Sequence, residues 1–178
     1  MDDRELMWAG GLISEDVRNR IKAIASINNE DLSLSRRFLD FPLHVSFKRS
    51  FYTNDFYRIR EDLAKLINDN GIISGGKLRL CKVKDMIWFR FEKEDELRSL
   101  HDKIDTFLLE RYDIAIDSFD ASYVPHISLF RDEDEEKLKV MYERMLKERF
   151  EDEADITSFF IGGKNHDNEY YRITGEKR

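Results

Sequence analysis

The sequence predicts an α+β fold with antiparallel sheets. Segments with the two-residue period of strands alternate along the chain with segments of helical period, so strands and helices are mixed. Neighbouring strand segments near the middle and at the end of the chain are separated by short turns, as in hairpins. The chain has 178 residues, of which 41% are hydrophobic and 12% aromatic. Residues 1–178 are therefore expected to form a single domain with a substantial core.

The first half of the chain is predicted to hold a strand at 6–13, a helix from Ser14, a strand at 41–47, a helix with apolar positions from Phe56 to Ile67, and a hairpin of strands 77–83 and 86–91. Ser14 is expected to cap the first helix, and Thr53 or Asn54 the second, because their side-chain oxygens can accept from free helix N–H groups. Asn70-Gly71 is expected to end the second helix.

The second half is predicted to continue with a helix around 97–108, a strand at 123–130, a helix around 138–145, and closing strands at 156–161 and 169–174 joined by a loop that contains Gly162-Gly163. The apolar positions of both helices recur every three or four residues, as on one face of a helix.

One motif occurs twice. Phe41-Pro42-Leu43-His44-Val45-Ser46-Phe47 and Tyr123-Val124-Pro125-His126-Ile127-Ser128-Leu129-Phe130 each precede a predicted helix. The two prolines of the chain lie just before the two histidines, where a strand can begin without a proline N–H. This repeat predicts two lobes related by a pseudo-twofold axis.

Each motif places an imidazole and a hydroxyl on one face of its strand. His44 and Ser46 share one face because side chains alternate, and His126 and Ser128 do the same. Two such strands side by side suit phosphodiester chemistry, because one histidine can accept a proton while the other donates one. The serines can donate to the phosphate oxygens, and the scheme requires no metal. The alternative is a pair of buried structural histidines.

The two motifs resemble the His-x-Thr/Ser motifs of the 2H phosphoesterase superfamily, and residues 119–131 are similar to the second motif of its 2′-5′ RNA ligase and cyclic phosphodiesterase branch. The resemblance covers nearly the whole chain. It implies a bilobal fold with a central cleft between two antiparallel sheets and helices outside. It also implies cleavage of 2′,3′-cyclic phosphates or 2′,5′-linked nucleotides, with His44 and His126 catalytic and Ser46 and Ser128 binding phosphate. Serine replaces the commoner threonine in both motifs.

Further candidates lie near the motifs. Basic residues that could hold a phosphate are Lys48, Arg49 and Arg131, of which Arg131 matches the family pattern. Aromatic residues that could stack on a base are Tyr123, Trp88, Tyr52 and Phe51. His101 and His166 are interpreted as structural and solvent-exposed, respectively, and Cys81 as a core residue. No metal site and no cofactor are expected.

The net charge of −7 argues against a broad basic face for duplex binding. A single cysteine fits the reducing cytoplasm, and the lack of a long apolar run argues against a membrane span. The protein is expected to be a cytoplasmic monomer. The predicted function is hydrolysis of a 2′,3′-cyclic phosphate or 2′,5′ linkage on a nucleotide or RNA end. Three alternatives stay open: hydrolysis of a cyclic or 2′,5′-linked signalling oligonucleotide, a nucleotide- or RNA-end-binding module without turnover, and a ligase that reverses cyclic-phosphate opening without ATP.

Overall fold

The computed structural model describes residues 4–174. In chain order the elements are β1 (Glu5–Ile13), α1 (Glu15–Asn28), α2 (Arg37–Asp40), β2 (Val45–Thr53), α3 (Phe56–Asn70), β3 (Ile73–Val83), β4 (Met86–Phe91), α4 (Asp95–Tyr112), a 3-10 turn (Asp120–Ser122), β5 (His126–Arg131), α5 (Glu135–Met145), β6 (Glu153–Gly163) and β7 (His166–Arg172). Every strand pairing is antiparallel, which confirms the predicted α+β class.

The expectation of two separate sheets is wrong. The seven strands within residues 4–174 form one sheet in the order β1-β2-β5-β4-β3-β6-β7, and β1 also pairs with β6. The link between β2 and β5 is narrow, with Val45 and Ile127 as its one registered pair. A sequence pattern shows which segments are strands, but backbone pairing across such a junction depends on how the strands meet in space.

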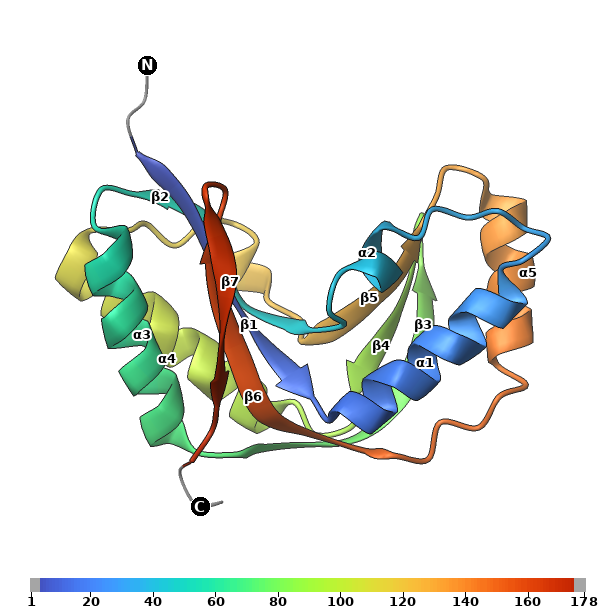
Figure 1. The fold of residues 1–178 in the computed structure, drawn as a ribbon. Helices are drawn as coiled ribbons and strands as arrows, with labels where there is room; N and C mark the ends of the chain where they lie inside the picture. The colour runs from blue at the N-terminus through green and yellow to red at the C-terminus, as the bar shows by residue number, and fades with distance from the viewer. Residues whose placement is uncertain (1–3, 175–178) are drawn as a thin grey trace.

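The helices lie in two groups on either side of the sheet (Figure 1). α3 and α4 pack against each other on one side, and α4 contacts β2 and β3. α1 and α5 pack together on the other side, and α5 contacts β3 and β4. The junction of β2 and β5 lies inside the sheet, between these two groups of helices (Figure 1).

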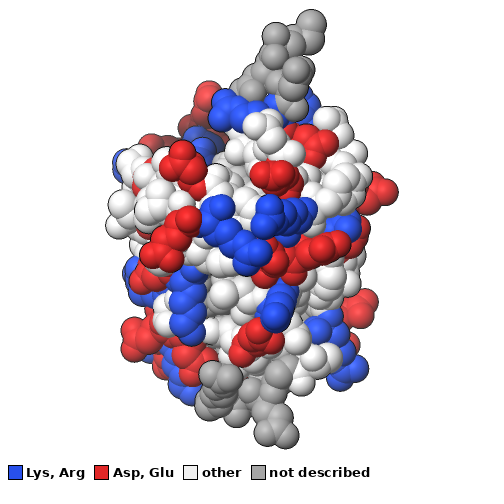
Figure 2. All heavy atoms as spheres, turned by 90° about the vertical axis from the view of Figure 1, so that its left-hand side faces the viewer, with Lys and Arg blue, Asp and Glu red and all other residues white. Residues whose placement is uncertain are grey.

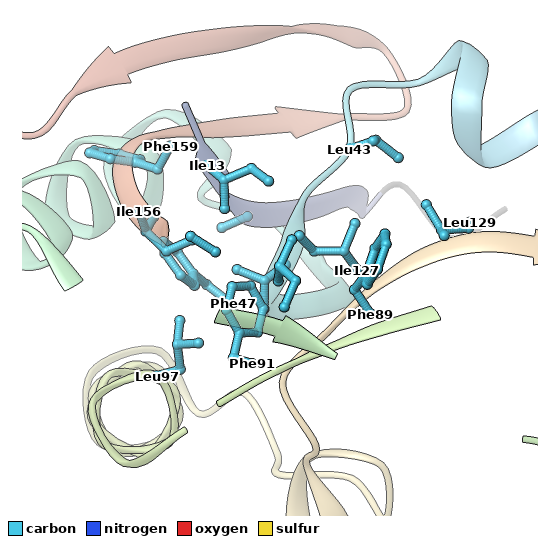
Figure 3. Packing of buried hydrophobic residues seen from close by; sticks show 14 of the residues in the cluster. Ile13, Leu43, Phe47, Phe89, Phe91, Leu97, Ile127, Leu129, Ile156 and Phe159 are labelled. Carbon is cyan, nitrogen blue, oxygen red and sulfur yellow. The ribbon is translucent and has the colours of Figure 1, made fainter. Parts of the chain in front are cut away.

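The core beneath the two motifs is made of their alternating apolar residues. Val45, Phe47 and Ile127 are all fully buried, as is Phe89 on β4. Figure 3 shows Phe47, Phe89 and Ile127 packed together from three different strands. Because one face of each motif is held in this core, the opposite face must carry the histidine and serine side chains.

α2 was not predicted from the sequence. It is four residues long and lies between α1 and β2, too short to show a helical period. It packs near β5 and brings Phe38 to the pocket described below.

Among residues 4–174, no helix is both long and apolar enough to cross a membrane.

Candidate active site

The two His-x-Ser motifs meet at the junction of β2 and β5. His44 lies one residue before β2, and His126 is the first residue of β5. Val45 pairs with Ile127 in an antiparallel register. Continuing that register by one residue each way sets His44 beside Ser128 and Ser46 beside His126. The motifs are therefore related by a local twofold axis, with each histidine next to the other motif's serine.

All four polar side chains line one small cavity of about 110 Å³. Its remaining wall is apolar and consists of Phe38, Phe41 and Leu43. The structure therefore brings together the four residues predicted from the sequence, although the second motif lies 82 positions after the first. The short sequence signal did not indicate Phe38 or Leu43 as parts of this wall.

Both imidazoles are held by the backbone two residues before them. Nδ1 of His44 lies 2.8 Å from the carbonyl oxygen of Pro42, and Nδ1 of His126 lies 2.7 Å from the carbonyl oxygen of Val124. A carbonyl oxygen only accepts, so each Nδ1 carries the proton and donates it. Nε2 of each ring is thereby left as the nitrogen for proton transfer with a substrate.

Aromatic rings surround the two histidines. Phe41 and Phe160 pack edge-on against His44 at centroid distances of 5.3 and 5.2 Å. Trp88 lies against His126 with the ring centroids 4.1 Å apart. Burial lowers the pKa of His44 despite the opposing hydrogen bond to Pro42, and positive charge on His126 lowers it further. Burial also lowers the pKa of His126. The pair therefore disfavours the doubly protonated state.

Gly10 on β1 allows the close approach of His44. A Cβ atom at this position would lie 2.9 Å from Cδ2 of His44 and 2.8 Å from the ring of Phe160. Gly10 is paired with Ser46 in the sheet. The glycine thus lets the imidazole ring lie against β1.

Lys48 does not reach the cavity. Its side chain is 3% exposed, and its ammonium binds Asp105 at 2.7 Å and also Asp120. Strict alternation would place Lys48 on the face of His44 and Ser46, but the β1–β2 register shifts on both sides of the Ala9–Lys48 pair. This irregularity turns Lys48 into the protein. The expectation that Lys48 binds phosphate in this pocket is therefore wrong.

Arg131 is also remote from the cavity. Its Nε donates to Asp85 at 2.7 Å, and both side chains are exposed. Arg131 pairs with Met86 at the turn end of the β4–β5 ladder, roughly 10 Å along the strand from Ser128. Arg49 is exposed and lies near the ring of Phe119. None of the predicted basic residues lines the cavity.

The predicted stacking residues occupy different environments. Tyr123 is 6% exposed, lies parallel to His101 at 3.8 Å, and donates its hydroxyl to the carbonyl oxygen of Ser46 at 2.9 Å. Because the Tyr123 ring is buried against His101 and its hydroxyl is bonded to Ser46, this side chain is not available to stack on a base. Trp88 is half-buried beside His126. Tyr52 is 53% exposed but lies outside the cavity, and Phe51 is 9% exposed.

A buried charged cluster behind β2 was missed by the sequence analysis. It consists of Lys48, His101, Asp105 and Asp120, each at most 6% exposed. Of the groups searched among residues 4–174, His101, Asp105 and Asp120 are the set whose ligand atoms lie close enough to hold a metal ion. The Lys48 ammonium already binds both carboxylates. The Lys48 ammonium therefore occupies the place next to the two carboxylates that a metal ion would otherwise take.

No family model and no curated protein matches the sequence. Solved structures do match. A protein described as a phosphoesterase is 11% identical, with 97% of both chains covered and a TM-score of 0.62. E. coli LigT is 11% identical, with 96% of this chain and 95% of LigT covered, at TM-scores of 0.59 without ligand and 0.60 with 3′-AMP. The chain has the 2H phosphoesterase fold.

This likeness confirms the α+β fold that the resemblance of the two His-x-Ser motifs implied, but the strands form one sheet and not two. At 11% identity the likeness establishes the fold alone. The roles of His44, His126, Ser46 and Ser128 rest on the geometry of the cavity described above and stay predictions.

Proposed function

We propose that this protein is a phosphodiesterase that hydrolyses a 2′,3′-cyclic phosphate or a 2′,5′ linkage on a nucleotide or RNA end. The observation that carries the proposal is the single cavity lined by His44, Ser46, His126 and Ser128. Both Nδ1 atoms are occupied by backbone carbonyls, so two Nε2 atoms are left for one reaction. The structures of LigT with phosphate, 3′-AMP, ATP and NADP⁺ support a nucleotide or phosphate ligand for this fold.

In the proposed reaction, a neutral histidine accepts a proton from water through Nε2 as the water oxygen attacks phosphorus. The other histidine, protonated at Nε2, donates that proton to the ribose oxygen as its bond to phosphorus breaks. Ser46 and Ser128 donate hydrogen bonds to the non-bridging oxygens, whose charge is held through the transition state. Each proton-transfer group contributes about 10²–10⁴-fold in rate. The proposed chemistry needs no metal.

The test is a turnover assay in EDTA with 2′,3′-cyclic nucleotides, a short RNA with a 2′,3′-cyclic end, and 2′,5′-oligoadenylate. We expect His44→Ala and His126→Ala each to lower kcat by at least about 10²-fold. Ser46→Ala and Ser128→Ala should raise KM and lower kcat by smaller factors, because each removes one donor to the phosphate.

His166→Ala is the matched control. His166 stacks on Phe56 and lies 3.2 Å from Glu5, away from the cavity. Its removal should leave kcat within about twofold, because the side chain lies outside the cavity and contacts none of its four polar residues. Turnover that survives both His44→Ala and His126→Ala would place the active site elsewhere. A folded wild-type protein that binds these ligands but turns over none of them would be a binding module.

A further inference from the structure

The reaction cavity is too small for a whole nucleotide. Its volume is about 110 Å³, whereas pockets that enclose a drug-sized ligand measure roughly 300–1,000 Å³. A phosphate group and part of a ribose fit this space. The rest of any nucleotide substrate must lie on the surface next to the cavity.

The sheet continues from the cavity toward β4 and β3 in two rows of side chains. In one row His126 pairs with Arg90, and Arg90 pairs with Arg79. In the other, Ser128 pairs with Trp88, and Trp88 pairs with Cys81. Directly paired residues in antiparallel strands point to the same face. The contact between the Trp88 and His126 rings agrees with this placement.

These rows end in a second depression, which we call the β3–β4 groove. It has a volume of about 640 Å³, and its lining includes Arg79, Cys81, Arg90, Glu92, Lys93 and Glu94. Adjacent strands lie about 4.8 Å apart, so Arg79 is roughly 10 Å from His126 across the sheet. The long arginine side chains extend over part of that distance, so the phosphate next to the reacting one can come within their reach.

Two arginines from neighbouring strands can bind a phosphate with several charge-assisted hydrogen bonds. In the structure Arg79 is paired with Glu92 at 3.1 Å and Arg90 with Glu94 at 2.7 Å. The Arg79 side chain is 70% exposed and that of Glu92 is 41% exposed. An exposed ion pair such as Arg79–Glu92 contributes roughly 0–1 kcal/mol, whereas Glu94 is only 14% exposed and keeps Arg90 in place. A phosphate can therefore displace Glu92 from Arg79.

We propose that the β3–β4 groove binds the phosphate of the nucleotide next to the reacting one. The substrate would then be the end of an oligonucleotide and not a mononucleotide. This inference rests on the proposed function for the reacting phosphate, but the groove itself is argued from the strand register and the groove residues. Trp88 forms the surface between the two phosphates.

The kinetic test compares two substrates, a mononucleoside 2′,3′-cyclic phosphate and a four-nucleotide RNA with a 2′,3′-cyclic end. The quantity measured is the ratio of kcat/KM for the RNA to kcat/KM for the mononucleotide. Arg79→Ala should lower this ratio about tenfold, because a charge-assisted phosphate contact is lost. Glu92→Gln should raise the ratio, because it removes the group that competes with phosphate for Arg79.

Arg20→Ala is the matched control, since Arg20 is an exposed arginine that is paired with Asp152 at 2.6 Å. It lies on α1, outside the groove, and should leave the ratio unchanged. The KM for the RNA should also rise with salt less steeply in Arg79→Ala than in the wild type. An Arg79→Ala variant in which both substrates lose kcat/KM equally would overturn the proposal.

A second test does not depend on turnover. Cys81 is the one cysteine of the chain and is half-buried in the groove. Its alkylation by iodoacetamide should be slowed by a 2′-O-methyl tetranucleotide that ends in a 3′-phosphate, and not by inorganic phosphate. Arg79→Ala should abolish this protection.

The two tests separate the groove from the proposed catalysis. Protection of Cys81 together with a lack of turnover would support the groove and reject the hydrolase. Turnover of the RNA without any protection of Cys81 would support the hydrolase and overturn the groove.

Discussion

His44 and His126 titrate in half-buried, largely aromatic surroundings, and these surroundings determine the pH at which the pair can react. Burial lowers the pKa of both imidazoles below the usual value of about 6.5. The proposed mechanism requires one neutral and one protonated histidine. As the pH rises past both lowered pKa values, the proton on the general acid is lost.

We therefore predict that kcat/KM reaches its maximum below pH 6.5, because this parameter reports the free enzyme. Above that pH, kcat/KM should fall about tenfold per pH unit. The maximum of kcat should lie at higher pH, because a bound phosphodiester anion stabilises the imidazolium. The measurement is a pH profile of both parameters between pH 4.5 and 8.5. A kcat/KM maximum above pH 7 would contradict the prediction.

Tyr123 links the two motifs without reaching the cavity. Its hydroxyl donates to the carbonyl oxygen of Ser46 at 2.9 Å, and its ring is stacked on His101. It also lies three residues before His126. Since Val45 and Ile127 form the one registered pair between β2 and β5, the Tyr123 hydroxyl supplies an additional tie across a narrow junction.

Tyr123→Phe should lower kcat by about 10- to 100-fold while KM changes little, because displacing a catalytic group by ~1 Å can cost ~10²-fold. Tyr112→Phe is the control, since it removes a hydroxyl that binds Asp62 far from the cavity. Thermal unfolding of both variants would show whether stability accounts for the loss. Equal kcat values for the two variants would argue against a positioning role for Tyr123.

The N-termini of the helices differ in how they are capped, although residues suited to capping precede several of them in the sequence. The Asp134 side chain accepts a hydrogen bond from the Lys137 N–H at 3.1 Å at the start of α5. Ser14 precedes α1 but makes no such bond. At α3 the N-cap is Asp55, not Thr53 or Asn54, whereas Gly71 ends the helix with φ at +80°, as the sequence predicts.

Asp134→Ala should therefore destabilise the protein by about 1 kcal/mol, which is the typical contribution of an N-cap side chain. Ser14→Ala should cost less, because no cap bond is lost. Urea unfolding of the two variants against the wild type measures both changes. A larger loss for Ser14→Ala would mean that α1 is capped in solution by a bond that the structure lacks.

The single sheet joins the two groups of helices into one cooperative structure. β6 pairs with β1, β3 and β7, so it connects strands on both sides of the molecule. Two independent sheets would allow the lobes to unfold separately. Because the two parts share backbone hydrogen bonds and a core, we expect them to unfold together.

We predict one unfolding transition, with the midpoint in urea the same by circular dichroism and by tryptophan fluorescence. Trp8 lies on β1 and Trp88 on β4, so the two tryptophans report on different strands of the sheet. Separate transitions for Trp8→Phe and Trp88→Phe variants, each followed by the remaining tryptophan, would show that the lobes unfold independently.

Surface charge agrees with binding that is restricted to a small region. Over α3 and α4, Lys and Arg side chains are interspersed with Asp and Glu, and one sign does not form a continuous face (Figure 2). With a net charge of −7, the protein is not expected to bind long duplexes through a broad basic surface. The two phosphate sites that we propose, the cavity and the β3–β4 groove, are accordingly both small regions.

The sequence was sufficient for the elements with strong periodicity and for the two His-x-Ser motifs. Strand alternation is local, so it indicates correctly that His44 and Ser46 share a face opposite Val45 and Phe47. The matching prolines and the following helices mark the repeat without knowledge of the fold. These local signals led to the cavity and to the fold class.

The positions of Lys48, Tyr123 and Arg131 depended on the assembled fold. Lys48 is turned inward by an irregular β1–β2 register, and two aspartates far along the chain neutralise it. Joining the strands into a single sheet likewise depended on pairings between distant segments. Bulges and long-range pairing arise from contacts between segments remote in sequence, and the alternation of a single strand carries no record of those contacts.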